Sequence, residues 1–319
     1  MDQYVLQRHF WENEQMKNSL SSRVRPVLKW AGGKTQLLPQ IAQRYPQELG
    51  KKISKYAEPF IGGGAVLFDI LSKYSLDAVY ISDINEALIN MYVQIKKNVE
   101  NLICELSSIE KTYWQSDEAE RKRIYTQKRN IFNQLISNPD ETNAIQRAYL
   151  LIFLNRTCFN GLYRVNRRGF FNVPIGSYKK PLICDTENLR KVSEALKNVE
   201  VVCGNYAQCE TFVDQNTFVY FDPPYRPLST TSNFTSYTEQ SFDDKEQEKL
   251  ALFAKKLSEK KASVLLSNSD PKNTDPNDSF FDDLYSDFRI SRVCASRMIN
   301  SNAQNRGAVS ELLIMNYAV

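Results

Sequence analysis

The sequence contains one histidine in 319 residues, His9, in a polar N-terminal stretch. Histidine is the commonest general acid–base residue and a member of Ser-His-Asp and Cys-His catalytic groups, so these kinds of catalysis are not expected. Most metal sites with imidazole ligands are excluded for the same reason. Any chemistry must therefore use carboxylates, amides, backbone groups or a bound cofactor.

The six cysteines are scattered, and none forms a C-x-x-C pair. The sequence therefore lacks the spacing typical of zinc and redox motifs, and we expect buried or incidental thiols. No apolar run approaches the roughly 18 residues that a membrane span requires. Residues 1–22 also lack the apolar region of a secretory signal. We expect a cytoplasmic protein that binds neither a metal ion nor a membrane.

Positive charge is concentrated in the middle of a chain whose formal net charge is only +4. Lysine and arginine are frequent between Lys111 and Lys197, and aromatic residues are interleaved with them. Such a region suits a polyanionic partner such as nucleic acid. A solvated helical surface would give the same charge pattern, so charge alone does not separate the two interpretations.

Short apolar runs alternate with helical patterns, which predicts an α/β fold: a Rossmann-like, mostly parallel sheet with helices on both faces. The alternation is interrupted by a mostly helical stretch from about Ala87 to Leu154, followed by a β-hairpin over Arg164–Val173. We therefore predict an N-terminal extension (1–24), an α/β domain (25–88 and 186–319) and an insert (89–185). The expected strands are Lys55–Phe60, Ala78–Ser82, Val199–Cys203, Thr217–Phe221, Ala262–Ser267 and Glu311–Tyr317, and the expected helices flanking them include Ala65–Tyr74 and Gln247–Lys260.

The first candidate ligand site is EPFIGGG at Glu58–Gly64, where an expected strand runs into a helix. Glycines let the backbone approach a ligand at the carboxyl edge of the sheet. A dinucleotide fingerprint needs another glycine three residues after Gly64, where this chain has leucine, whereas the F-x-G-x-G motif of adenosylmethionine enzymes is complete in Phe60, Gly62 and Gly64. Asp83, after the next strand, offers a carboxylate for both ribose hydroxyls of an adenosine. A tight turn in any doubly wound protein is the alternative.

The second segment, KWAGGKT at Lys29–Thr35, is similar to the end of a phosphate-binding P-loop. The first glycine of that loop would have to stand at position 28, which is leucine, so the spacing excludes an ATPase motif. The backbone amides and lysines remain suited to an anion. They could hold the methionine carboxylate of adenosylmethionine.

The third segment, DPPY at Asp222–Tyr225, follows an apolar strand. The exocyclic amine of adenine is a poor nucleophile because its lone pair is delocalised into the ring. The Asp222 carboxylate and the Pro223 carbonyl can accept its two N–H groups, which exposes the lone pair to a sulfonium methyl group. Tyr225 can stack on a flipped base, and its ring face favours a nearby cation. The pattern indicates methylation of an amine without histidine.

The sequence closely resembles the Dam family of GATC-specific DNA adenine methyltransferases over nearly the whole chain after about Arg25. In this class the target-recognition domain lies between the cofactor motif and DPPY. The resemblance therefore implies a Rossmann-like S-adenosylmethionine-dependent methyltransferase domain, with the insert 89–185 as the DNA target-recognition domain. Matching segments are KWAGGK at Lys29–Lys34, EPFIGGG at Glu58–Gly64, SDIN at Ser82–Asn85, NRTCFNGLYR at Asn155–Arg164, GFFNVPIG at Gly169–Gly176, DPPY at Asp222–Tyr225, PLSTTSNFTSY at Pro227–Tyr237 and ELL at Glu311–Leu313.

The resemblance also implies functional residues. Phe159 and Asn160 match the pair that enters the duplex near the flipped base, while core packing is the alternative for Phe159 and Leu162. Arg164 matches a base-reading position, and a phosphate contact is its alternative. The implied catalytic residues are Asp222, Pro223, Pro224 and Tyr225; the cofactor contacts are Trp30, Lys34, Phe60, Gly62, Gly64, Asp83 and Asp222; and the DNA contacts are Lys29, Phe159, Asn160, Leu162, Arg164 and Pro174.

We therefore expect transfer of a methyl group from S-adenosyl-L-methionine to adenine N6 in double-stranded DNA, at GATC and by base flipping. The enzyme is expected to be a monomer in solution, with more than one copy able to occupy a DNA molecule. Methylation of cytosine N4 or of adenine in RNA is an alternative, because DPPY chemistry suits any exocyclic amine. A DNA-binding homologue without catalysis and a nicotinamide oxidoreductase are further alternatives. Enzymes from restriction-modification systems, phages and regulatory pathways would look alike in sequence.

Overall fold

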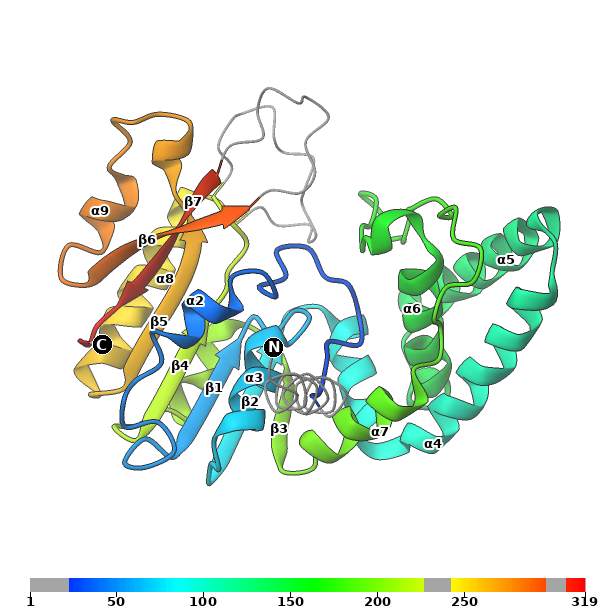
Figure 1. Ribbon diagram of the computed structural model, residues 1–319, viewed down its shortest axis with the longest axis horizontal. Helices are drawn as coiled ribbons and strands as arrows, with labels where there is room; N and C mark the ends of the chain where they lie inside the picture. The colour runs from blue at the N-terminus through cyan, green and yellow to red at the C-terminus, as the bar shows by residue number, and fades with distance from the viewer. Residues whose placement is uncertain (1–22, 227–241, 297–307, 319) are drawn as a thin grey trace, which may run out of the picture.

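One sheet of seven strands, in the order β3-β2-β1-β4-β5-β7-β6, organises the computed structural model (Figure 1). The structure describes residues 23–226, 242–296 and 308–318. Every pairing is parallel except those of β7, which runs antiparallel to both of its neighbours. This architecture confirms the predicted α/β fold. The strands are β1 (Lys55–Pro59), β2 (Ala78–Asp83), β3 (Val199–Cys203), β4 (Thr217–Phe221), β5 (Ser263–Ser269), β6 (Arg289–Ser296) and β7 (Ala308–Met315).

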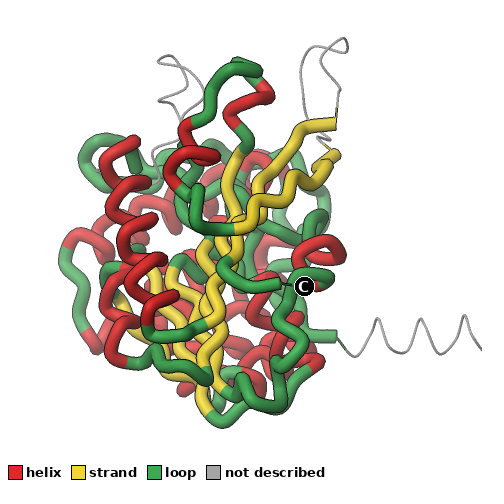
Figure 2. Tube along the Cα trace, turned by 90° about the vertical axis from the view of Figure 1, so that its left-hand side faces the viewer, coloured by secondary structure: helices red, strands yellow, loops and turns green. Residues whose placement is uncertain are grey.

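The sheet has two apolar faces, because successive side chains of a strand point to opposite sides. In β4, Phe218 and Tyr220 pack in one core, whereas Val219 and Phe221 pack in the other, and all four are fully buried. Helices cover both faces, as Figure 2 shows. The first core includes residues of α2 (Leu38–Ala42), α3 (Ala65–Lys73) and α4 (Glu86–Gln115), and the second includes residues of α8 (Asp244–Glu259) and α9 (Phe280–Leu284).

The insert is a group of helices that leaves the sheet after β2 and returns before β3 (Figure 1). Helix α4 starts beside the sheet, where Asn85 caps it by accepting a hydrogen bond from the Leu88 amide, and it is interrupted at Asn98 by non-helical backbone. It therefore continues across the predicted boundary at residues 88 and 89, and the division into domains stays a prediction. The other elements here are α5 (Glu118–Ser137), η1 (Glu141–Asn143), α6 (Ala144–Thr157), η2 (Phe159–Gly161) and α7 (Thr186–Ala195).

The segment predicted as a β-hairpin, Arg164–Val173, forms a tight turn with one antiparallel bridge, between Val165 and Phe171. Gly169 has the left-handed conformation that we predicted, with φ of 75°. Paired strands do not develop, because the chain beyond the turn bonds elsewhere: Ile175 forms a bridge with Cys158. The hairpin is therefore shorter than expected.

The sequence patterns missed strand β6 and the helices α2 and α7. Strand β6 lies at the sheet edge, and its sequence RISRVCAS alternates apolar residues with arginine and serine too weakly to stand out. Helix α7 follows the basic region and was not separated from it. Residues 1–22 of the expected extension (1–24) and the PLSTTSNFTSY motif at 227–237 lie outside the described residues. Two short helices complete the description, η3 (Tyr206–Thr211) and η5 (Pro271–Asn273).

Candidate active site

The sheet changes its direction of growth at β1, which has β2 on one side and β4 on the other. Ligands of open α/β sheets bind outside the carboxyl ends of the strands at such a point. Strand β1 leads into the glycine turn Phe60–Gly64, and β4 leads into Asp222. The two motifs therefore leave neighbouring strands at the same edge. Asp83 ends β2 on the other side of β1.

The glycine turn is built from left-handed backbone. Phe60, Gly62 and Gly64 have φ of 90°, 48° and 73°. A Cβ atom on Gly64 would lie 2.9 Å from the Tyr92 hydroxyl, and one on Gly62 would lie 3.0 Å from Cδ1 of Trp30. Side chains are thus excluded at both glycines. The turn brings the backbone close to Trp30, one of the residues predicted to contact the cofactor.

Asp83 lies beside this turn. Its two carboxylate oxygens accept backbone hydrogen bonds from Gly62 at 3.2 Å and from Asn85 at 3.0 Å. Burial raises the pKa of Asp83, and these amides oppose the rise. A carboxylate oxygen has more than one lone pair, so each can still accept a hydroxyl donor. The nearby Phe60 ring is stacked on Tyr206, with ring centroids 5.3 Å apart.

Lys34 connects the KWAGGK segment to DPPY. Its ammonium group lies 2.6 Å from Oδ1 of Asp222 and donates a hydrogen bond to the Gly32 carbonyl at 2.8 Å, while its side chain is only 4% exposed. Ser267 donates to the same oxygen of Asp222 at 3.1 Å. Among the described residues no donor reaches the other oxygen, Oδ2. Burial raises the pKa of Asp222, and the charge of Lys34 opposes this rise.

The two proline carbonyls of DPPY differ in their surroundings. Gln247 of α8 donates its amide to the Pro224 carbonyl at 3.1 Å and accepts a hydrogen bond from Asn268 at 3.1 Å. The Pro223 carbonyl receives no hydrogen bond from any described residue. Pro223 therefore retains an acceptor, as the sequence analysis required. Gln247, Asn268 and Ser267 were not predicted as site residues. Ser267 and Asn268 could have been suspected, because they are polar residues that follow the apolar run of strand β5.

Tyr225 is held by its hydroxyl and its ring. The hydroxyl donates to Glu311 of β7, and the ammonium of Lys34 lies 4.6 Å from the ring centroid. The ELL segment thus contributes the acceptor that orients Tyr225, a role that the sequence motif did not reveal. The Lys34 ammonium thus lies beside both the Asp222 carboxylate and the face of the Tyr225 ring, an environment that favours positive charge.

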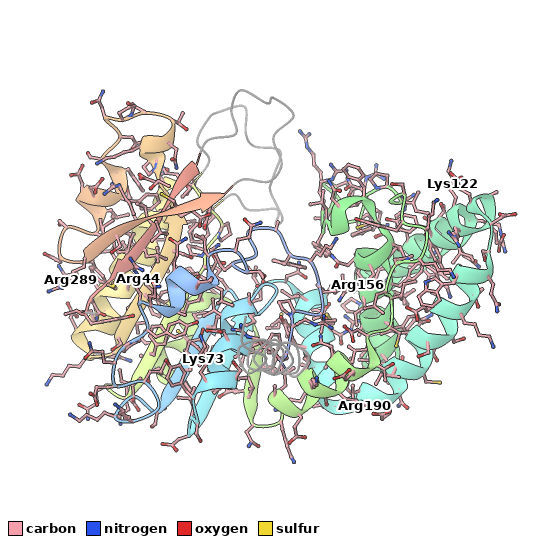
Figure 3. All side chains as sticks on the ribbon, in the orientation of Figure 1. Arg44, Lys73, Lys122, Arg156, Arg190 and Arg289 are labelled. Atoms are coloured by element: carbon pink, nitrogen blue, oxygen red, sulfur yellow. The ribbon has the colours of Figure 1, made fainter. Side chains whose placement is uncertain are left out.

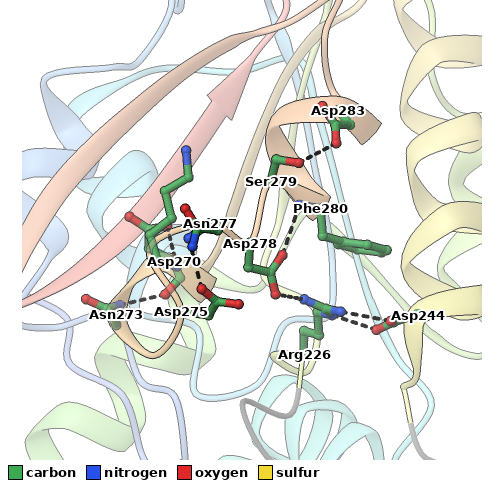
Figure 4. A network of polar contacts seen from close by, with 11 residues as sticks. Arg226, Asp244, Asp270, Asn273, Asp275, Asn277, Asp278, Ser279, Phe280 and Asp283 are labelled. Carbon is green, nitrogen blue, oxygen red and sulfur yellow. Dashed lines mark hydrogen bonds and ion pairs between the residues drawn. The ribbon is translucent and has the colours of Figure 1, made fainter.

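Arg226 anchors the chain directly after Tyr225 (Figure 4). Its guanidinium group donates to both oxygens of Asp244, at 2.7 and 3.0 Å, and to Asp278 at 2.6 Å. The same group lies 4.2 Å from the ring centroid of Phe280. Because the side chain is 19% exposed, these ion pairs are partly shielded from solvent. They fix the end of DPPY to the start of α8.

The residues predicted to contact DNA lie on loops that adjoin α6. Phe159 is 52% exposed and follows Cys158, so the alternative of core packing is wrong for this residue. Its backbone amide donates to the Pro174 carbonyl at 2.9 Å, which joins the two loops. Asn160 is exposed with φ of 55°, whereas Leu162 is half-buried and packs against the core.

The remaining two, Arg164 and Lys29, are exposed. The guanidinium of Arg164 donates to the side chain of Asn172 at 2.8 Å. The ammonium of Lys29 lies 5.5 Å from the ring centroid of Tyr178. Next to Lys29, Trp30 stacks on Tyr163 with centroids 5.1 Å apart. The KWAGGK segment therefore contacts both the glycine turn and the insert.

Part of the basic middle region stabilises the insert itself. Arg147 pairs with Glu86, and Arg121 donates to backbone carbonyls at the end of α4. Arg190 pairs with Glu100, and Figure 3 shows it far from Lys122 on the insert. The basic composition is thus not a single DNA-facing patch. Exposed cations near the predicted DNA contacts are Arg164, Arg167, Arg168, Lys179 and Lys180.

The described residues offer neither a metal site nor a membrane-spanning helix. No cluster of three or more histidine, cysteine, aspartate or glutamate residues could hold a metal ion. No helix in this part of the chain has the length and apolar character needed to cross a membrane.

Comparison with known proteins identifies relatives along almost the full chain. The family model for D12 class N6 adenine-specific DNA methyltransferases matches residues 30–299. The chain is 50% identical over 296 residues to the Type II methyltransferase M.MjaIII of Methanocaldococcus jannaschii, covering 92% of this chain and 99% of the relative. It is 37% identical over 303 residues to the Type II methyltransferase M1.LlaDCHI of Lactococcus lactis subsp. cremoris, covering 94% and 98%. It is 35% identical over 292 residues to the DNA adenine methylase of Vibrio cholerae, covering 91% and 95%.

These matches confirm the resemblance and the enzyme class that the motifs implied. They favour adenine in DNA over cytosine N4, RNA and nicotinamide chemistry. A methyl donor and a DNA substrate follow from the family. The chain belongs to the D12 class of N6 adenine-specific DNA methyltransferases.

Proposed function

We propose that this enzyme methylates adenine N6 within 5′-GATC-3′ of double-stranded DNA, with S-adenosylmethionine as methyl donor and with the target base flipped out of the helix. The observation that carries the proposal is the pair of acceptors at DPPY. Oδ2 of Asp222 and the Pro223 carbonyl receive no donor from the described residues, whereas Oδ1 and the Pro224 carbonyl are occupied. Two acceptors match the two N–H groups of one exocyclic amine.

The residues at the ends of β1 and β2 fit S-adenosylmethionine. Asp83 has lone pairs for ribose hydroxyls, and the glycine turn holds its backbone close to Trp30, one of the proposed cofactor contacts. The bound cofactor would supply an electrophilic methyl group. Trp30, Lys34 and Phe60 complete the proposed contacts.

These residues would promote catalysis by orienting the substrate amine and by keeping an ionised acceptor beside it. By accepting both N–H groups, Asp222 and Pro223 draw the amine nitrogen toward tetrahedral geometry and expose its lone pair. The exposed lone pair would then form a bond to the methyl group of bound S-adenosylmethionine as its carbon–sulfur bond breaks, and the nitrogen would release one proton to solvent. Asp222 must be ionised to accept the first N–H group. Lys34 favours that state, because its positive charge opposes the effect of burial on the pKa of Asp222.

The recognition of GATC rests on the resemblance of Asn155–Arg164 and of Lys29 to the Dam family. We assign base reading to Lys29, Leu162, Arg164 and Pro174, and entry into the duplex to Phe159 and Asn160. The exposure of Phe159 supports this assignment, since a base that leaves the stack costs a few kcal/mol and leaves a gap to fill. A bidentate contact of Arg164 with guanine would contribute about 1–3 kcal/mol of discrimination.

A plasmid assay tests the proposal. Purified enzyme and S-adenosylmethionine are incubated with unmethylated plasmid, which is then digested with GATC endonucleases that sense adenine methylation. Protection from the methylation-blocked endonuclease is expected, and Asp222→Ala should abolish it. Unmethylated DNA despite bound cofactor, N6-methyladenine at other sites only, or full activity of Asp222→Ala would each contradict the proposal.

A further inference from the structure

One buried amide, the side chain of Asn155 in the last turn of α6, joins two distant segments. Its Oδ1 accepts a hydrogen bond from the Lys29 amide at 2.9 Å, and its Nδ2 donates to the carbonyls of Lys29 and Gly161 at 2.9 and 2.8 Å. The residue is 1% exposed, so solvent does not compete for these bonds. We infer that Asn155 is a positioning residue for DNA recognition, which sets Lys29 and the turn Phe159–Gly161 in a fixed relationship.

The three bonds use both N–H donors of the amide and its oxygen, so the side chain is fixed in its orientation. The two segments also pack directly against each other. Gly161 has φ of 65°, and a Cβ atom there would lie 2.5 Å from Cδ of Lys29. The Lys29 side chain therefore passes over a position where only glycine fits. Asn155 holds the backbone on both sides of this crossing.

The same segment continues to the candidate active site. Lys29 is followed by Trp30, which stacks on Tyr163, and then by Lys34, which pairs with Asp222. The place of the DNA relative to the methyl-accepting site would thus depend on how firmly Lys29 and the turn are held. This inference rests on the proposed function, because it assumes that Lys29 and Phe159 contact DNA.

Asn188 of α7 provides a matched control. It makes the same reciprocal pair of bonds with the same segment: the Arg25 amide donates to its Oδ1 and its Nδ2 donates to the Arg25 carbonyl, both at 2.9 Å. It is also buried, at 3% exposed. Among the described residues, however, Asn188 makes no hydrogen bond to the turn 159–161. Its loss would loosen the chain at Arg25 and leave the bonds of Asn155 to Lys29 and to the turn in place.

The experiment compares Asn155→Ala, Asn188→Ala and Phe159→Ala in the full chain. Flipping is measured by the fluorescence of 2-aminopurine at the target adenine of a GATC duplex, and discrimination by kcat/KM for GATC against singly substituted sites. We expect Asn155→Ala to lower both flipping and discrimination by about tenfold, since that corresponds to about 1.4 kcal/mol and to the loss of ordinary hydrogen bonds. KM for the methyl donor should not change, and Asn188→Ala should alter neither readout.

A second variant guards against misfolding of Asn155→Ala. Gly161→Ala keeps the amide but forces a side chain into the Lys29 crossing, so it should reproduce the loss of flipping and discrimination. Equal effects of Asn155→Ala and Asn188→Ala, or wild-type behaviour of Gly161→Ala, would overturn the inference while leaving the proposed function intact. If Phe159→Ala itself flips and discriminates normally, the DNA contact assigned to Phe159 fails and the inference fails with it, whereas the plasmid assay decides the proposed function separately.

Discussion

Buried Lys34 forms an ion pair with the partly exposed Asp222, with Nζ of the lysine 2.6 Å from Oδ1 of the carboxylate. The pair joins the KWAGGK segment to DPPY and occupies one carboxylate oxygen, while the other receives no donor from the described residues. The charge of Lys34 also opposes the effect of burial, which raises the pKa of Asp222. The predictions below follow from this pair and from the contacts around it.

Replacing Lys34 by methionine should move the acid limb of the activity profile to higher pH. Burial already raises the pKa of Asp222 above its ordinary value, and removal of the ammonium raises it further. Activity requires ionised Asp222, so it is lost as pH falls through this pKa, and the loss begins at higher pH in the variant. Single-turnover methyl transfer across the pH range measures the limb. Lys34→Arg, which keeps the charge, is the control; an unshifted limb in Lys34→Met would count against the ion pair.

Replacing Gln247 by leucine should lower kcat and leave KM for the methyl donor unchanged. The variant loses the bond to the Pro224 carbonyl and leaves the amide of Asn268 without its acceptor. We expect about a tenfold decrease in kcat, since an orphaned buried donor costs about 1–3 kcal/mol. Steady-state kinetics tests this, with exposed Glu248→Ala as the control. A change confined to KM would show that Gln247 does not orient DPPY.

Replacing Arg226 by lysine should destabilise the protein despite the retained charge. Lysine cannot reproduce the two parallel bonds to Asp244 or the bond to Asp278. The expected decrease in the free energy of unfolding is about 1–3 kcal/mol, toward the lower end of this range because solvent partly screens the exposed ion pairs. Urea unfolding measures it. Lys249→Arg, in the exposed pair with Glu246, should change stability little, and equal effects would contradict the prediction.

Replacing Glu58 by glutamine should make stability less dependent on pH. Burial raises the pKa of Glu58 well above its ordinary value, and the hydrogen bond from Tyr56 opposes this only in part. The folded state therefore binds this proton more tightly than the unfolded state. As pH rises from the ordinary glutamate value through the folded value, wild-type stability falls. Urea unfolding at pH 5 and pH 8 should show a larger decrease for wild type than for Glu58→Gln, with exposed Glu200→Gln behaving like wild type.

The sequence predicted the parts of the site that follow directly from strand ends. Asp83 and Asp222 each come after an apolar run, and parallel strands place such residues at one edge. The glycine turn could be interpreted in the same way, because it directly follows the apolar strand β1.

The partners of these residues were not predictable in the same way. Gln247 contacts Pro224 only because α8 packs behind β4, and Glu311 reaches Tyr225 only because β7 inserts between β5 and β6. Neither fact leaves a local pattern in the chain. The short hairpin at Arg164–Val173 was overestimated for a related reason: a tertiary bridge from Ile175 to Cys158 ends its pairing.

The bonds of Asn155 also define what can be exchanged between members of the family. A chimera that took the insert 89–185 from a relative would place a foreign turn 159–161 against the Lys29 of the host. The packing at this crossing is so tight that a Cβ atom on Gly161 would lie 2.5 Å from Cδ of Lys29. The residues that would determine the proposed sequence preference therefore lie in two separate parts of the chain, the insert and Lys29–Lys34. Chimeras that exchange both parts should retain activity that chimeras exchanging the insert alone would lose.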